Sequence, residues 1–230
     1  MDILHYTEAH HDFRKRLRAF MDREVVPHID RWEADRGVSR EVWRKMGRAG
    51  FLCPMLPTAY GGLGGDFRFS VIGIEEISRT NHGGLGAPLH SDIVVPYIMS
   101  YGSDAQKQTY LPGCAAGDIV TAVAMTEPGA GSDPASISTS AVEEGDEVVL
   151  NGSKTFITNG ILADLLDVAP LDERAQHTVD VDTANGRHLA PGQRLLVGHD
   201  RERLEGGTAE AGRLTLEHVL LDVGGEIGMG

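Results

Sequence analysis

The aromatic residues of this chain are confined to its first two-thirds. Its two tryptophans, five tyrosines and six phenylalanines all lie at or before Phe156, and residues 157–230 contain no lysine or serine either. Aromatic side chains bury the largest areas and dominate hydrophobic cores. We therefore expect the packed core to come from residues 1 to about 165, and we regard residues 167–230 as a diverged segment.

Helical periodicity dominates residues 1–117. Five segments have the apolar spacing of amphipathic or buried helices, and they begin near residues 7, 39, 71, 93 and 103. Thr7 and Ser39 are suitable N-caps, and Ser103 with Gln106 forms a capping box. This region is therefore predicted to be an all-α helical bundle.

From residue 118 the pattern changes to that of β-strands. Apolar or alternating runs predict strands at 119–125, 136–142, 148–150 and 154–158 and, more weakly, at 163–169, 194–198 and 213–222. Glu144-Gly145-Asp146 supplies a turn before the strand at 148–150, and Asn151-Gly152 is the strongest two-residue hairpin signal, so we expect it to join the strands on either side of it. The predicted fold class is α+β, with the helical bundle at 1–117 followed by a β-sheet or barrel-like domain at 118–230.

Charge and composition exclude several classes of function. The formal net charge is −13, which disfavours binding to nucleic acid or to an anionic membrane surface. No apolar run approaches the ~18 residues of a membrane span, and no signal-peptide pattern is present, so we expect a soluble, cytoplasmic protein. The two cysteines indicate no disulfide framework, and Cys53 is expected to be packed.

The histidines and the first basic cluster are expected to be solvated. His177, His188 and His199 are eleven residues apart, but they lack a metal-ligand pattern, so no metal site is predicted. His10, His11 and the basic residues from Arg14 to Arg18 are interpreted as the solvent-facing side of the first helix.

Two short segments carry the clearest functional signal. The first runs from Ala124 to Asp133 (AMTEPGAGSD) and the second from Lys154 to Gly160 (KTFITNG). Each is a strand end that opens into a glycine-rich or Asn-Gly turn, where backbone N–H groups and a threonine hydroxyl are available as hydrogen-bonding groups. Either segment alone is commonplace. Together they suit a flat heteroaromatic ring with several acceptors, with Phe156 as its apolar wall.

The same segments resemble the acyl-CoA dehydrogenases, a family of FAD flavoenzymes. Residues Met125–Asp133 are similar to that family's first signature. Further similarity, in the same order and at matching spacing, lies in Tyr60–Gly64, Tyr101–Pro112 and Asp146–Lys154. The resemblance covers residues 1 to about 166.

The resemblance implies a set of site residues. The implied FAD-binding residues are Met125, Thr126, Phe156, Ile157 and Thr158. In relatives, the Met125-Thr126 backbone and the Thr126 hydroxyl contact the pyrimidine end of the flavin. The Phe156 position stacks beside the isoalloxazine, and Thr158 lies near its N5. Ser132 lies where relatives contact the acyl-CoA substrate, although a turn-forming role with Asp133 stays open.

The implied reaction is α,β-desaturation of an acyl-CoA thioester. A carboxylate removes the α proton while the β hydrogen leaves as hydride to FAD. The electrons then pass to an electron-transferring flavoprotein or a similar acceptor. The family's base is a glutamate of a third, helical domain with no counterpart in these residues, so no catalytic residue is assigned. Glu127 and Glu144 are not given that role.

Two alternatives stay open. One is a non-catalytic remnant or partner subunit that associates with a complete dehydrogenase. The other is an acyl-CoA oxidase-like relative that passes electrons to oxygen. In each case we expect a homo- or hetero-oligomer, and the length of the acyl chain is not determined by these residues.

Overall fold

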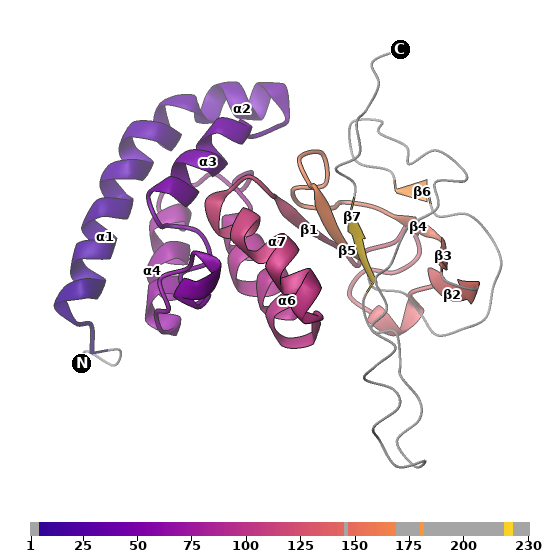
Figure 1. The fold of residues 1–230 in the computed structure, drawn as a ribbon. Helices are drawn as coiled ribbons and strands as arrows, with labels where there is room; N and C mark the ends of the chain where they lie inside the picture. The colour runs from indigo at the N-terminus through magenta and orange to yellow at the C-terminus, as the bar shows by residue number, and fades with distance from the viewer. Residues whose placement is uncertain (1–4, 145–146, 169–179, 182–218, 223–230) are drawn as a thin grey trace. The chain divides into compact units, whose positions relative to one another are not determined.

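The computed structural model describes residues 5–144, 147–168, 180–181 and 219–222 (Figure 1). It divides into two compact units, Met1–Thr121 and Ala122–Gly230. The first contains helices and the second contains strands, which confirms the predicted α+β class. The domain boundary predicted at 117/118 stays a proposal. Within the described ranges, no helix combines the length and the apolar character needed to cross a membrane.

The first unit is built from helices of very different lengths. Its α-helices are α1 Glu8–Phe20, α2 Ile29–Asp35, α3 Arg40–Arg48, α4 Phe67–Ser78, α5 Ala87–Leu89, α6 Val95–Tyr101 and α7 Asp104–Ala116. Between them lie the π-helical turns η1 Met21–Val25 and η4 His90–Val94, and the 3₁₀ turns η2 Val26–His28 and η3 Thr58–Tyr60. All five predicted helical segments are present.

Capping residues begin three of these helices, as predicted. Thr7 precedes α1 in an extended conformation. The Ser39 hydroxyl accepts a hydrogen bond from the Glu41 N–H at 3.2 Å. At α7, the Ser103 hydroxyl accepts from the Gln106 N–H at 3.2 Å, and the Gln106 side chain accepts from the Ser103 N–H at 2.8 Å. Such caps satisfy backbone donors that the first helical turn leaves without partners.

An aromatic cluster forms the core of the helical unit. The Phe13 ring meets Phe51 and Phe69 edge-on, with centroids 5.5 and 5.2 Å apart, and Phe20 meets Phe51 at 5.4 Å. Trp43 is fully buried in α3. Edge-to-face pairs add to the free energy of burial, so the aromatic residues stabilise this unit as their distribution suggested.

The described residues of the second unit form short strands in three sheets. The strands are β1 Thr121–Ala124, β2 Ser140–Glu144, β3 Glu147–Asn151, β4 Ser153–Lys154, β5 Leu165–Val168, β6 Asp180–Val181 and β7 Val219–Asp222, with the 3₁₀ turn η5 Pro134–Ser136 before β2. One sheet has the order β1-β5-β7, with β5 and β7 antiparallel. Strand β2 pairs with β3 antiparallel, and β4 pairs with β6 parallel.

The predicted Asn151-Gly152 hairpin is wrong. The hairpin lies one turn earlier, where β2 and β3 pair in a register that sets Glu144 opposite Glu147. Strands β3 and β4 belong to different sheets. Glycine is required at position 152 for a different reason: a Cβ there would lie only 2.1 Å from the Thr139 hydroxyl oxygen. The glycine allows the two backbones to approach, and the chain then changes sheets.

The strand predicted at 154–158 is shorter than expected. Strand β4 ends at Lys154, and Phe156 has a φ of +57° that no strand residue adopts. The weaker predictions at 163–169 and 213–222 are confirmed where the structure describes them, as β5 and β7. The predicted strand at 194–198 and the three histidines spaced by eleven residues lie outside the described residues.

Candidate functional site

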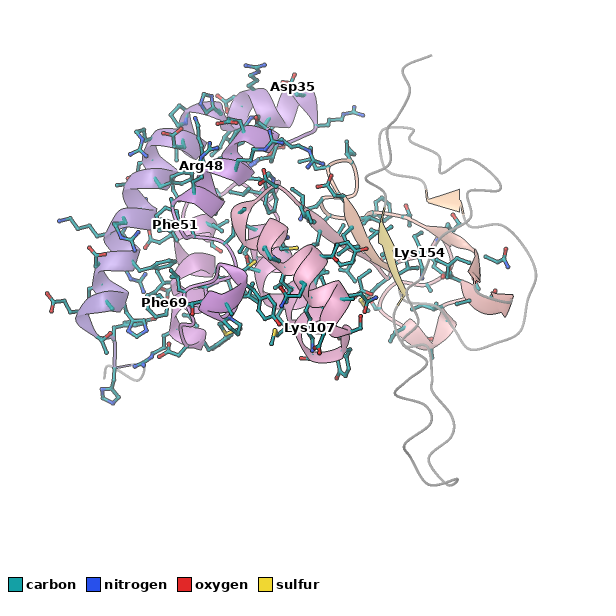
Figure 2. The ribbon with its side chains drawn as sticks, viewed as in Figure 1. Asp35, Arg48, Phe51, Phe69, Lys107 and Lys154 are labelled. Carbon is teal, nitrogen blue, oxygen red and sulfur yellow. The ribbon has the colours of Figure 1, made fainter. Side chains whose placement is uncertain are left out.

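A fully buried ion pair joins the two segments that carried the functional signal. The Lys154 side chain is fully buried and that of Glu127 is 3% exposed, and Lys154 Nζ lies 2.8 Å from Glu127 Oε1. Nζ also donates to the Met125 carbonyl oxygen at 3.0 Å. Lys154 is the last residue of β4 (labelled in Figure 2), whereas Glu127 opens the tight turn that closes at Ala130. Residues 27 positions apart are thus fixed together.

The Glu127 carboxylate is saturated with hydrogen bonds. Oε2 accepts from the Ser138 N–H at 2.7 Å and from the Ser138 hydroxyl at 2.6 Å, and Oε1 accepts from the Thr139 N–H at 2.9 Å. Burial opposes its charge, but the hydrogen bonds from Lys154, Ser138 and Thr139 outweigh burial and lower the pKa of Glu127 to about 2. A carboxylate held in this way is a fixed anion, unsuited to the role of a base.

The pKa of Lys154 is also set by burial and by the ion pair. Burial lowers the pKa of its ammonium group, and the hydrogen bond and charge of Glu127 raise it in return. Removing either partner would leave an uncompensated charge in the interior, which is far more costly than an exposed charge. The pair therefore acts as a unit that holds the end of β4 against the Met125–Ala130 turn.

One backbone hydrogen bond brings the predicted site residues side by side. The Thr155 N–H donates to the Thr126 carbonyl oxygen at 2.9 Å. Met125 and Phe156, the neighbours of these two residues, are large apolar side chains left 46% and 82% exposed. Two exposed apolar side chains of this size, on segments joined by a hydrogen bond, offer a contact surface for a ligand.

Phe156 is held in a conformation that costs free energy. Its φ of +57° lies in the left-handed region, which bulky residues with a Cβ rarely adopt. Strained backbone of this kind persists only where the surroundings enforce it, and it concentrates at ligand sites. The two residues before Phe156 are fixed, Thr155 by its hydrogen bond to Thr126 and Lys154 by burial, and the Phe156 ring itself is exposed.

Hydrogen-bonding groups remain available beside these side chains. In the part of the chain that the structure describes, neither the N–H nor the hydroxyl of Thr126 has a hydrogen-bond partner, and the same holds for Thr158. Ile157 accepts from the Gly160 N–H at 3.0 Å, which closes a turn immediately after Phe156. The Thr155–Thr126 hydrogen bond thus places Thr126 beside the segment that carries Phe156 and Thr158, and a role of these residues in binding FAD stays a prediction.

Ser132 lies apart from this arrangement along the chain. It is exposed, in the loop between the Glu127–Ala130 turn and η5. The turn-forming role considered for it belongs to its neighbour, because the Asp133 carboxylate accepts from the Ala135 N–H at 3.1 Å and from the Ser136 hydroxyl at 2.8 Å. A contact between Ser132 and substrate stays a prediction.

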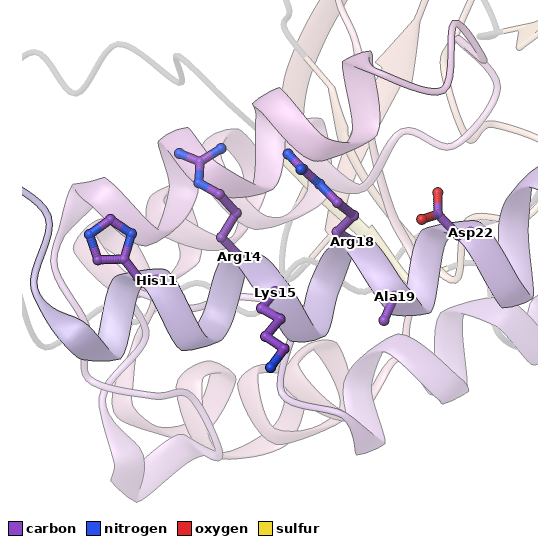
Figure 3. A pocket seen from close by; sticks show the side chains of 6 residues that line it. All are labelled: His11, Arg14, Lys15, Arg18, Ala19 and Asp22. Atoms are coloured by element: carbon purple, nitrogen blue, oxygen red, sulfur yellow. The ribbon is translucent and has the colours of Figure 1, made fainter.

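A surface pocket elsewhere has different chemistry. It is lined by residues of α1 and η1 alone, namely His11, Arg14, Lys15, Arg18, Ala19 and Asp22 (Figure 3). Arg14 and Arg18 are committed to Glu76 of α4, at 3.2 and 2.7 Å. The pocket contains none of the predicted site residues, and its arginines hold two helices together.

The interpretation of His10 as a solvated residue is wrong. Its side chain is 3% exposed, and Nε2 lies 3.1 Å from an Asp66 carboxylate oxygen. Arg14 and Arg18 were expected only to face solvent, but both also contact the buried carboxylate of Glu76. Cys53 is buried, as predicted, and Cys114 is buried with it.

Two family models match this chain. One is described as "Acyl-CoA dehydrogenase, N-terminal domain" and matches residues 7–118; the other is "Acyl-CoA dehydrogenase, middle domain" and matches residues 122–187. The chain belongs to the acyl-CoA dehydrogenase family. The second match contains every implied FAD-binding residue.

Individual relatives of this acyl-CoA dehydrogenase family member agree. The mitochondrial long-chain specific acyl-CoA dehydrogenase of Mus musculus is 44% identical over 169 residues, which are 74% of this chain and 39% of that protein. An acyl-CoA dehydrogenase structure from Geobacillus kaustophilus has a TM-score of 0.71 and 51% identity, covering 75% of this chain and 46% of that one. A glutaryl-CoA dehydrogenase from Mycobacterium smegmatis, solved in complex with FADH2, has a TM-score of 0.66 and 28% identity, covering 77% and 44%.

This acyl-CoA dehydrogenase family chain spans less than half the length of these relatives. The residues that the sequence interpretation missed are Glu127 and Lys154 as a pair. A lysine that ends an apolar strand, in the segment that pairs with a Glu-Pro-Gly turn, was the available signal. Neither residue alone indicated a partner 27 positions away.

Proposed function

We propose that this chain forms the FAD-binding part of an acyl-CoA dehydrogenase. The residues proposed to hold the cofactor are Met125, Thr126, Phe156, Ile157 and Thr158. The observation that carries the proposal is the Phe156 ring, which is 82% exposed in a strained conformation beside two threonines with available hydrogen-bonding groups.

The chemistry of these groups fits a flavin. An isoalloxazine has flat apolar faces, for which an exposed phenylalanine ring is a suitable wall, and a polar pyrimidine edge, for which the Thr126 N–H and hydroxyl are suitable partners. When bound, FAD supplies the acceptor for the hydride of an α,β-desaturation. The chain's own contribution is to orient the isoalloxazine and to exclude water from the face that Phe156 covers.

The proton of that reaction needs a separate base. Glu127 is excluded from the role because its carboxylate is buried, ion-paired and lowered in pKa to about 2. The family resemblance assigns the base to a third domain, and no residue of this chain is proposed as catalytic. We propose an acyl-CoA thioester as the substrate, with Ser132 as a contact.

A second candidate function is that of a partner subunit, because the buried Glu127 carboxylate beside the proposed cofactor site is held as a fixed anion and is unsuited to be the base. Such a subunit would obtain the base by associating with a complete dehydrogenase. Electrons removed from the substrate must leave FAD, so an electron-transferring flavoprotein is the proposed acceptor. Oxygen would take its place in an oxidase-like relative. A homo- or hetero-oligomer and a cytoplasmic location also stay proposals.

The direct test is retention of FAD by the purified chain. The chain is mixed with excess FAD, passed through a desalting column, and examined for visible flavin absorption. We expect retained flavin in the wild type, and a loss of at least tenfold in affinity for Phe156→Ala, because the exposed ring contributes its stacking area. Phe67→Ala is the matched control, since Phe67 is 60% exposed on α4, in the other unit.

Each result of this test is informative. A colourless wild type contradicts FAD binding by the isolated chain and favours the partner-subunit alternative. Equal retention by Phe156→Ala contradicts the assigned wall. Bleaching of the bound flavin by an added acyl-CoA would show that the chain also has the desaturation activity, whereas bound flavin that acyl-CoA does not bleach would show that the base is not among these residues.

A further inference from the structure

The Lys154 ammonium group contacts a peptide group of the candidate site. It donates a 3.0 Å hydrogen bond to the Met125 carbonyl oxygen. That oxygen and the Thr126 N–H belong to the same planar, conjugated peptide unit. Among the described residues, this N–H has no hydrogen-bond partner. The buried cation therefore sits at one end of a peptide whose other end is available to a ligand.

A cation at the carbonyl end strengthens the N–H as a donor. It draws electron density toward the oxygen and away from the nitrogen, and hydrogen bonds in a chain polarise one another in this way. Charged donors give the strongest effect, particularly in an interior of low dielectric. The side chain of Lys154 is fully buried, so water does not screen its charge.

Glu127 fixes the ammonium group beside the Met125 carbonyl. The Nζ atom donates to both Glu127 Oε1 and the Met125 oxygen, and the carboxylate also accepts from the Ser138 N–H and hydroxyl and from the Thr139 N–H. The anion thus keeps the lysine charged and in position.

We infer that Lys154 is a positioning residue that acts through the Met125–Thr126 peptide, making the Thr126 N–H a stronger donor to the pyrimidine edge of FAD. The inference rests on the proposed function. Reduction of a flavin places additional electron density on that edge, so a stronger donor favours the reduced over the oxidised form. Lys154 thereby raises the reduction potential of the bound cofactor without touching it.

The experiment compares Lys154→Met with the charge-preserving Lys154→Arg. Lys15→Met is the matched control, because Lys15 is an exposed lysine of α1 and its replacement removes the same charge. In the ligand-free chain, the ¹H and ¹⁵N resonances of the Thr126 amide are recorded. We expect an upfield shift in Lys154→Met, substantial recovery in Lys154→Arg, and no change in Lys15→Met.

The second measurement is the two-electron reduction potential of bound FAD. We expect Lys154→Met to reduce the preference for the reduced form about tenfold, which is a fall of ~30 mV, and Lys154→Arg to restore most of it. If Lys154→Met fails to fold, the double variant Glu127→Gln/Lys154→Met removes both charges while keeping a carbonyl acceptor for the Ser138 N–H and hydroxyl. It is expected to show the same amide shift and the same fall.

The outcomes separate this inference from the proposed function. A wild type that binds no FAD, together with a Thr126 amide shifted in Lys154→Met, overturns the proposed cofactor site and leaves the polarised peptide supported. Bound FAD with equal potentials and an unmoved Thr126 amide overturns the role of Lys154 and leaves the cofactor site supported. Weaker FAD binding with an unchanged potential shows a merely structural lysine and also overturns the inference.

Discussion

Each of the two units contains a buried carboxylate, and the two are held in different ways. Glu76 of α4 is 1% exposed and meets Arg14 and Arg18 of α1, as well as Arg79. These hydrogen bonds, from Arg18 first, outweigh burial and lower the pKa of Glu76. All three guanidinium groups also reach solvent, with side chains 24% to 49% exposed.

Glu127 of the strand unit has one charged partner, and that partner is fully buried. Its other donors come from Ser138 and Thr139, mostly from backbone N–H groups. The Glu76 network therefore joins helices through several partially solvated contacts, so that losing one is tolerable. The Glu127 pair fixes backbone at one place and has no substitute, which is the arrangement expected where a ligand must be positioned.

The largest expected effect comes from breaking the Lys154 pair. Lys154→Met leaves Glu127 as an uncompensated buried anion, which costs about 3–5 kcal/mol. The loss should be confined to the strand unit and is measured by amide hydrogen exchange of Ala122 and Val168, both fully buried there. Both tryptophans, Trp32 and Trp43, lie in the helical unit, so their fluorescence reports that unit separately.

The double variant Glu127→Gln/Lys154→Met serves as the control. Because it removes both charges, it should recover a substantial part of the loss. A Lys154→Met chain whose exchange protection matches the wild type would contradict the contrast between the two carboxylates.

A second expected effect separates the units by pH. His90 is fully buried; burial lowers its pKa to about 4 from 6.5, and the hydrogen bond to the Cys114 carbonyl only partly opposes this. A folded state that binds the proton more weakly than the unfolded state loses stability as pH falls from 6.5 toward 4, on the order of 3 kcal/mol in all. The helical unit should therefore weaken already between pH 6.5 and 4.5.

Glu127 titrates in a lower range. Its folded pKa of about 2 lies below the ordinary 4.5, so its contribution is complete above pH 4.5 and is lost only as pH falls toward 2. Urea unfolding at pH 7 and pH 5, followed by tryptophan fluorescence, tests the helical unit, because the Trp43 ring lies 5.4 Å from His90. Amide hydrogen exchange of Ala122 and Val168 at the same two pH values tests the strand unit. His90→Asn should flatten this pH dependence, and an unaltered dependence in that variant would show that another group is responsible.

The sequence predicted local features better than distant contacts. Helix starts at Ser39 and Ser103 were correct because a capping residue and its partner lie within three positions of each other. The burial of His10 was missed because its partner, Asp66, is 56 residues away. The Asn151-Gly152 signal was misleading because close approach to Thr139 also requires a glycine. A two-residue pattern cannot distinguish these two needs.

In the candidate site, too, local features were predicted and a distant contact was missed. The threonines and Phe156 were predicted from paired motifs and a family resemblance, and the structure joins their segments through the Thr155–Thr126 hydrogen bond. Their positioning by Lys154 depends on a buried contact across 27 residues, and its strength depends on desolvation. Such an interaction emerges only after the chain has folded, so composition and spacing did not indicate it.

The smallest expected effect concerns the redundant carboxylate. Glu76→Gln keeps the side-chain shape and an acceptor oxygen, and the arginines it releases can turn to water, so the cost should be about 1 kcal/mol. Glu75→Gln, at the preceding position, is the matched control. The Glu75 side chain is 49% exposed and contacts Arg14 alone among the described arginines. We expect its replacement to change the free energy of unfolding by no more than about 0.5 kcal/mol. Urea unfolding followed by tryptophan fluorescence measures both. A loss for Glu76→Gln as large as that for Lys154→Met would mean that solvent access of the arginines does not lessen the cost, and that the two carboxylates are equivalent.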